Sequence, residues 1–60
     1  MKIKRFAIAV GRMYVAPIRL HGGYCLTPVK EDAWVFFENC GAIGWIINHH
    51  DIHGAKVVRL

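Results

Sequence analysis

Residues 27–41 read TPVKEDAWVFFENCG and give the clearest local signal in this chain of 60 residues. Thr27 is a favourable N-cap, and Pro28 suits the first helical position because an N–H there would have no partner within the helix. Gly41 is a typical residue for ending a helix. Between them, apolar residues recur at the spacing of one helical face, and these are Val29, Ala33, Phe36, Phe37 and Cys40. The sequence therefore predicts a helix at about residues 28–40.

The chain before this helix has the pattern of a β-hairpin. KIKRFAIAV (2–10) and MYVAPIRL (13–20) are rich in strand-forming residues, and only Gly11 and Arg12 separate them. Pro17 cannot donate to a ladder of hydrogen bonds, so the second strand is expected to lie at a sheet edge or to bend there. The first segment imitates a signal peptide, but its apolar part is only about five residues long, and it is interpreted as a strand.

Three further segments are predicted to be strands, namely YCL (24–26), IGWIIN (43–48) and AKVVRL (55–60). The last two flank NHHDIHG (48–54) and are expected to pair as a second hairpin. The predicted order is ββ(β)αββ, an α+β single domain over residues 1–60 in which the helix at about 28–40 packs on one face of a mainly antiparallel sheet. The alternative is a small all-β barrel in which AWVFFEN (33–39) is a strand.

The hydrophobic content is 55%, a large share for a chain of this length. A domain of about 60 residues buries only about 60% of the surface that its unfolded chain exposes, so apolar side chains must stay exposed or meet another chain. Self-association as a homodimer is therefore expected.

No apolar run approaches the roughly 18 residues of a membrane span, and two cysteines are too few for a secreted disulfide framework. A cytoplasmic protein without membrane contact is expected.

The net charge of +4 is unevenly distributed. The predicted helix holds three acidic residues against Lys30, whereas the rest of the chain holds seven basic residues against Asp51. A single helix covers one face of a sheet, so basic side chains are expected on the other face. Exposed aromatic residues are the usual anchors of interfaces, and Trp34 lies off the apolar stripe of the predicted helix. The residues expected to contact a partner are Trp34, Tyr14, Tyr24, Arg5, Arg12, Arg19, Lys56 and Arg59.

Catalytic chemistry has little support in this sequence. Serine is absent, and the only threonine, Thr27, is expected to cap the helix. Glu31 and Asp32 are adjacent and do not converge on one site as paired acid and base carboxylates must. The sequence contains no phosphate-binding loop, dinucleotide fingerprint or HExxH motif. We therefore expect a protein that is not an enzyme and that uses no cofactor.

The segment NHHDIHG contains three of the four histidines. If it were extended, His49, Asp51 and His53 would point to one side, and two histidines with one carboxylate are typical ligands of first-row transition metals. However, the segment lies between two predicted strands and ends in Gly54, as a hairpin loop does. Ligands at a loop tip also lack a supporting shell. A polar turn is the favoured interpretation, and metal binding is the minority hypothesis.

These patterns favour a small non-enzymatic binding protein that acts through protein–protein contacts, with an acidic partner, as an accessory regulator or inhibitor of the kind that phages also encode. The second hypothesis is a basic nucleic-acid-binding module, with cations on phosphates and Tyr14, Tyr24 or Trp45 stacking on bases. The third is an oligomer that binds a metal or sequesters a small anionic ligand between subunits.

Overall fold

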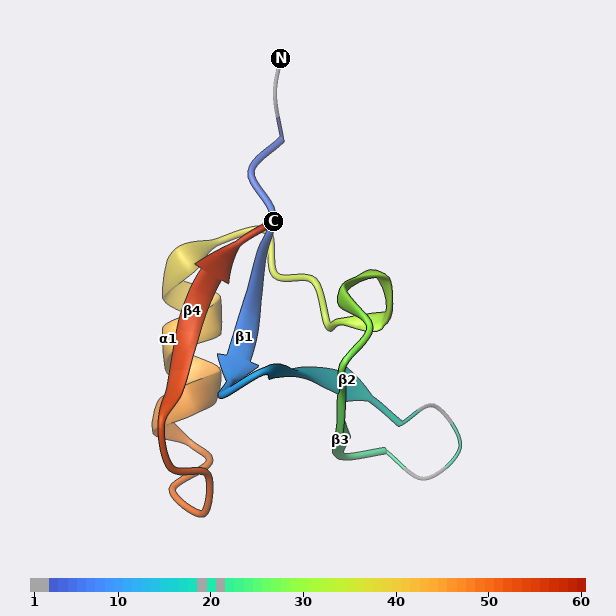
Figure 1. Ribbon diagram of the computed structural model, residues 1–60. Helices are drawn as coiled ribbons and strands as arrows, with labels where there is room; N and C mark the ends of the chain where they lie inside the picture. The colour runs from blue at the N-terminus through green and yellow to red at the C-terminus, as the bar shows by residue number, and fades with distance from the viewer. Residues whose placement is uncertain (1–2, 19, 21) are drawn as a thin grey trace.

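The computed structural model describes residues 3–18, 20 and 22–60, and these form one antiparallel sheet of four strands and one α-helix (Figure 1). The elements are β1 (Phe6–Val10), β2 (Met13–Pro17), β3 (Tyr24–Thr27), the 3-10 turn η1 (Lys30–Asp32), α1 (Asn39–Ile47) and β4 (Ala55–Arg59). The strand order is β3-β2-β1-β4, and the sheet is not closed into a barrel. The predicted α+β class is confirmed. Within the described part of the chain, no helix is long and apolar enough to cross a membrane.

The position of the helix was predicted wrongly, because α1 begins at Asn39 and not near residue 28. The capping signal is real, since the N–H of Val29 donates to the Thr27 hydroxyl oxygen at 3.1 Å. However, only the short turn η1 follows this cap, and Ala33 after it has extended backbone, with φ −64° and ψ 146°. The N–H of Trp34 then donates to a carbonyl oxygen of β2 at 2.8 Å. These sheet contacts outweigh the helical spacing of the apolar residues in this segment.

Residues 43–48, predicted to be a strand, lie mostly in α1. The helix contains two glycines and three isoleucines, which are weaker helix formers than alanine or leucine. Its stability comes from packing: Ala42 is fully buried, and Trp45 and Ile46 pack against the core beside it. Only β4 follows the helix, and it pairs with β1 instead of forming a second hairpin. The order is therefore βββαβ, not ββ(β)αββ.

The predicted hairpin of β1 and β2 is confirmed, with Val10 opposite Met13 and Gly11 at a positive φ of 62° in the turn. The two strands pair over only two positions, after which β2 leaves β1 and continues with β3 (Figure 1). Pro17 lies in this departing half, opposite Tyr24, so its missing N–H costs no bond to β1. The strand β2 is an inner strand that bends away from its neighbour, not a sheet edge.

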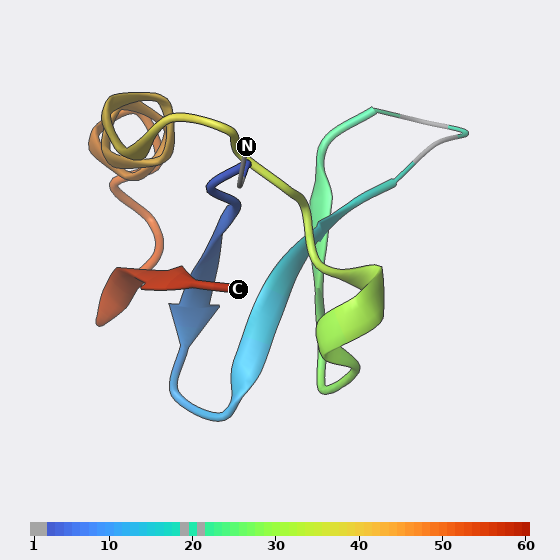
Figure 2. The same cartoon turned by 90° about the horizontal axis from the view of Figure 1, so that it is seen from above.

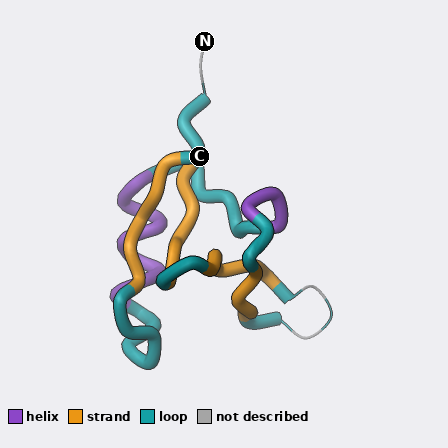
Figure 3. The backbone as a smooth tube through the Cα atoms, viewed as in Figure 1, coloured by secondary structure: helices purple, strands orange, loops and turns teal. Residues whose placement is uncertain are grey.

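The segment after η1 fills the gap between β1 and β2. Phe6 and Phe36 exchange two backbone hydrogen bonds of 2.7 and 2.8 Å, so the segment joins β1 on the side that β2 has left. Seen from above, β1 and β2 lie between α1 and η1 (Figure 2), and the tube in Figure 3 shows β1 and β4 running side by side next to α1. A cluster of fully buried residues joins the sheet to α1, with Ile8 and Val15 from the strands and Ala42 from the helix.

Candidate functional site

The sheet has one face covered by α1 and one face that α1 does not cover, which we call the outer face. Ile8 and Val57 point to the helix side, so their chain neighbours Ala9 and Lys56 point to the outer face. Ala9 is paired with Lys56 on β4 and with Tyr14 on β2, so these three side chains form one row across the sheet. Because alanine is much smaller than its two neighbours, the row has a depression at its centre.

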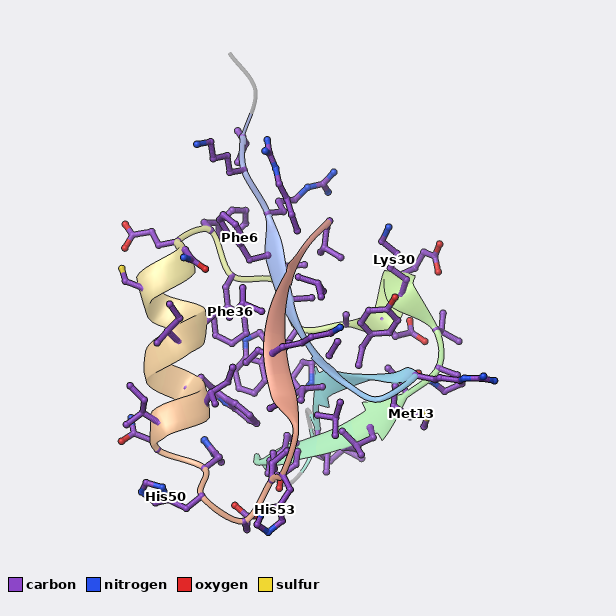
Figure 4. All side chains as sticks on the ribbon, turned by 60° about the vertical axis from the view of Figure 1, so that its left-hand side comes forward. Phe6, Met13, Lys30, Phe36, His50 and His53 are labelled. Atoms are coloured by element: carbon purple, nitrogen blue, oxygen red, sulfur yellow. The ribbon has the colours of Figure 1, made fainter. Side chains whose placement is uncertain are left out.

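A hollow of about 250 Å³ lies over this row. Its lining comes from β1, β2, β4, η1 and the turn between β1 and β2, and consists of Ala9, Gly11, Arg12, Tyr14, Lys30, Lys56, Val58 and Arg59. Four of these residues are cationic, and no described residue of the lining is a carboxylate. We call this site the basic hollow. Figure 4 shows Lys30 on η1, on the far side of the molecule from α1.

The cations of the basic hollow lie together without an acidic residue in the lining. Because like charges lie close together, the local potential is positive, and an anion placed among them would be attracted. A neighbouring hollow of about 290 Å³ shares Lys30 and adds Arg5, Glu31, Val35 and Leu60. The carboxylate of Glu31 therefore lines the neighbouring hollow and not the basic hollow. The lining of the basic hollow can therefore attract a negatively charged group.

Four of the residues expected to contact a partner meet at this hollow, namely Arg12, Tyr14, Lys56 and Arg59. Arg5 lines the neighbouring hollow, and Arg19 lies outside the described residues. Lys30 was missed, because the sequence assigned it to an acidic helix. The sequence offered one signal for a different placement. Pro28, followed by Lys30 and two acidic residues, is a pattern that also suits a short turn instead of a long helix. The folding of η1 onto the outer face brings Lys30 to the other cations.

Tyr24 and Trp34 lie elsewhere, in a group of ring contacts that we call the aromatic cluster. The Trp34 ring is 5.8 Å from Phe36 and stacked on it, and is 6.3 Å from Trp45. Tyr24 meets Trp45 edge-on at 5.2 Å. All four are partly buried against the core on the helix side of the sheet. The expectation that Trp34 is exposed came from its place on a helix that does not form there.

The histidine segment connects α1 to β4 and extends the aromatic cluster. The His49 ring stacks on Trp45 at 3.8 Å, with 13° between the planes. Its Nδ1 lies 2.7 Å from the Trp45 carbonyl oxygen. Because a carbonyl only accepts hydrogen bonds, Nδ1 carries the proton and donates it. His49 is thereby held as a cap on the last turn of the helix, where four backbone carbonyls lack partners within the helix.

Asp51 is tied to the sheet by a side-chain hydrogen bond. The Tyr24 hydroxyl donates to Asp51 Oδ2 at 2.8 Å across 27 residues of sequence. This bond stabilises the carboxylate, so it lowers the pKa of Asp51 and raises the pKa of Tyr24. The contact fastens the loop after α1 to β3.

The structure does not assemble His49, Asp51 and His53 as a ligand set. In the residues that it describes, no group of three or more histidine, cysteine, aspartate or glutamate side chains lies close enough to hold a metal ion. His49 is turned onto Trp45 and Asp51 onto Tyr24. His50 and His53 are exposed on the loop and point away from the body of the molecule (Figure 4).

Comparison with known proteins found no family model, no curated protein and no solved structure that matches this chain. Any proposal about function therefore depends on the geometry of the chain itself. The basic hollow is the feature in which half of the eight expected contact residues come together.

Proposed function

We propose that this chain is a small non-enzymatic binding protein that docks an acidic segment of a partner protein in the basic hollow and thereby regulates or inhibits that partner. The observation that carries the proposal is the meeting of four cations, from three separate segments of the chain, in one hollow whose described lining has no carboxylate. Scattered surface cations are usually a solvated rim. Cations gathered at one concave site favour binding of an anionic group.

The aromatic residues favour an acidic protein over a single-stranded nucleic acid. Non-specific binders of single strands combine cations with aromatic rings on which successive bases stack. Here, only Tyr14 lies with the cations, whereas Tyr24 and Trp45 contact each other on the opposite side of the sheet. A carboxylate needs only nearby donors, and an arginine binds it through two parallel hydrogen bonds. Arg12 and Arg59 offer such donors at the hollow.

Binding without catalysis fits the composition of the hollow. Its described lining has no histidine, cysteine or carboxylate, the groups that most often act as nucleophile or general base. Cys25 and Cys40 are both exposed free thiols on other parts of the surface. Free thiols suit a reducing compartment, so a cytoplasmic location is part of the proposal. Self-association is also part of it, since much apolar surface stays exposed.

The proposal is tested with a labelled oligoglutamate peptide and a single-stranded DNA oligonucleotide of equal charge, titrated with the protein and followed by fluorescence anisotropy. Lys56→Glu reverses a cation of the hollow, and Lys4→Glu makes the same change of net charge at an exposed site outside its lining. We expect Lys56→Glu to weaken peptide binding about tenfold or more, and Lys4→Glu to have a small effect through net charge alone.

Three results would contradict the proposal. Equal losses in the two variants would show that only net charge attracts the peptide. Tighter binding of the oligonucleotide, with a steeper fall as salt is raised, would favour a nucleic-acid-binding protein. Binding of inorganic phosphate with no gain for the peptide would favour a site for a small anion. Circular dichroism of each variant, together with the neutral change Lys56→Gln, separates loss of binding from loss of fold.

A further inference from the structure

The helix α1 has an outer side that is apolar and uncharged. Its nine residues include no acidic or basic side chain, although the outward side of a surface helix usually carries them. Ala42, Trp45 and Ile46 point to the core. On the other side, Ile43 keeps 43% of its surface exposed and Ile47 keeps 59%, and both lie on one stripe with the exposed Cys40. We call Cys40, Ile43, Gly44 and Ile47 the outer stripe.

Exposed apolar surface continues beyond the beginning of the helix. Phe37 is 64% exposed and Ile3 is 73% exposed, and the two line one hollow together with Val35 and Arg5. Within the outer stripe, a Cβ on Gly44 would meet no atom within 4 Å, so the surface above it is open. The missing side chain lets another backbone approach closely at this point.

We propose that the outer stripe binds the same stripe of a second copy of this chain, as an antiparallel pair of α1 helices in a homodimer. This deepens the self-association included in the proposed function, and it does not depend on what the basic hollow binds. A contact through any cationic surface would be opposed by repulsion, because each copy has a net charge of +4. The outer stripe has no charge to desolvate or repel, and it lies on the other side of the sheet from the basic hollow.

The charge before α1 and the helix dipoles favour the antiparallel orientation. Glu38 is exposed immediately before the helix, and His50 is exposed just after it. In a parallel pair the two Glu38 carboxylates would come together. In an antiparallel pair the two Glu38 carboxylates lie at opposite ends of the interface, each near the exposed His50 of the other copy, and the two helix dipoles run in opposite directions. The twofold axis makes each such contact twice.

A stable interface buries about 800 Å² on each partner, and the chain exposes 4667 Å², so the dimer would take about a sixth of its surface. A helix pair of nine residues is short for this area. The exposed side chains of Phe37, two residues before α1, and of Ile3, which lines one hollow with Phe37, add apolar surface.

The first test measures mass by light scattering over a concentration series, in which a dimer has twice the 6.8 kDa of one chain. Ile43→Glu places a charge in the outer stripe, and Leu26→Glu is its control, because Leu26 on β3 is also 43% exposed. We expect a dimer for the natural sequence and for Leu26→Glu, and at least tenfold weaker association for Ile43→Glu. A monomer at millimolar natural protein, or equal effects of the two changes, would overturn the proposal.

Peptide binding measured on Ile43→Glu distinguishes this proposal from the proposed function. Retained binding of the oligoglutamate peptide by a monomeric variant shows that the hollow works without the dimer. If the natural protein is a dimer that fails to bind the peptide, the interface stands and the proposed function is contradicted.

The second test fixes the orientation by oxidation with copper phenanthroline in a Cys25→Ala background. In an antiparallel pair centred between Ile43 and Gly44, Cys40 of one copy lies opposite position 47 of the other. Adding Ile47→Cys should therefore give a disulfide-linked dimer, whereas Cys40 alone should give little. The two thiols of one helix are about 10 Å apart along its axis, too far to pair with each other. Efficient linkage through Cys40 alone, or no linkage in either protein, would overturn the antiparallel contact.

Discussion

The two faces of the sheet differ in the contacts that their aromatic and cationic side chains make. On the helix side, Trp34, Trp45 and Tyr24 contact one another, and the Tyr24 hydroxyl is bonded to Asp51. On the outer face, Lys56 and its neighbours line a hollow whose described residues include no carboxylate. Aromatic residues are typical of interfaces, yet here they pack against the core, whereas the cations line an exposed hollow that we propose as the binding site. Residue type alone therefore does not show whether a side chain packs against the core or lies at the surface.

The largest expected difference between the faces is in stability. Trp45 contacts Tyr24, Trp34 and His49, so Trp45→Ala removes the centre of the aromatic cluster. We expect it to lower the free energy of unfolding by about 3 kcal/mol or more, a large part of the roughly 3 to 9 kcal/mol expected for 60 residues. Urea denaturation measures the loss. A loss below about 1 kcal/mol would contradict the structural role of the cluster.

Phe37→Ala is the control for this change, because Phe37 is an aromatic residue that is 64% exposed. We expect it to change the free energy of unfolding by less than about 0.5 kcal/mol. Both substitutions are made in the Ile43→Glu background, so that self-association does not contribute to the measured stability.

A smaller and opposite effect is expected on the outer face. Lys56→Gln removes one of four cations that share the basic hollow. It should raise the free energy of unfolding by a few tenths of a kcal/mol at low salt, because repulsion between exposed like charges is of this size. Added salt should reduce the gain. Thermal unfolding of the variant and of Lys4→Gln at two salt concentrations measures it, and a destabilised Lys56→Gln would show that Lys56 serves the fold.

The smallest expected effect is the pH dependence from Tyr24 and Asp51. The hydrogen bond lowers the pKa of Asp51 in the folded state. Its contribution to the free energy of unfolding is therefore complete above the pKa of an aspartate in the unfolded chain, about 4. This contribution is lost as pH falls through the lowered pKa of the folded state. The same bond raises the pKa of Tyr24 in the folded state. The contribution of Tyr24 to the free energy of unfolding is therefore complete below about pH 10 and is lost as pH rises through the raised pKa.

Tyr24→Phe removes both contributions. We therefore expect its melting temperature to be lower than that of the natural protein at neutral pH, with the gap narrowing toward pH 3. Tyr14→Phe, on the outer face, should keep the pH profile of the natural protein. A gap that stays constant from pH 7 to pH 3 would show that the bond to Asp51 has no part in the difference.

The hairpin of β1 and β2 could be predicted because its signals are local. Gly11 and Arg12 separate two runs of strand-forming residues, and the glycine adopts the positive φ that such a turn requires. The α+β class was predicted correctly, although its helix was placed at the wrong residues. Four members of the basic hollow were also named from charge and residue type, since Arg12, Tyr14, Lys56 and Arg59 belong to the strands of one sheet or the turn beside them.

The location of the helix could not be predicted from local signals. Thr27 and Pro28 give a strong capping pattern, and the Thr27 hydroxyl does accept a hydrogen bond from Val29, but sheet bonds from Trp34 and Phe36 end the helical turn. Conversely, residues 39–47 have poor helix propensity and become helical because Ala42 and Trp45 reach the core. Propensities differ by less than about 1 kcal/mol per residue, so packing of larger free energy decides between them.

The sequence by itself determined the composition of this protein's surfaces: an excess of cations, an uncharged apolar segment at residues 39–47, and a turn that sets β1 against β2. Only the tertiary structure decided which side chains meet. In it, η1 lies on the outer face, so that Lys30 and Lys56 line the same hollow. His49 stacks on Trp45, and Asp51 accepts a hydrogen bond from Tyr24. The physical reason is that charge and hydropathy belong to single residues, whereas a site is a set of distances that exists only after long-range hydrogen bonds and packing have fixed the chain.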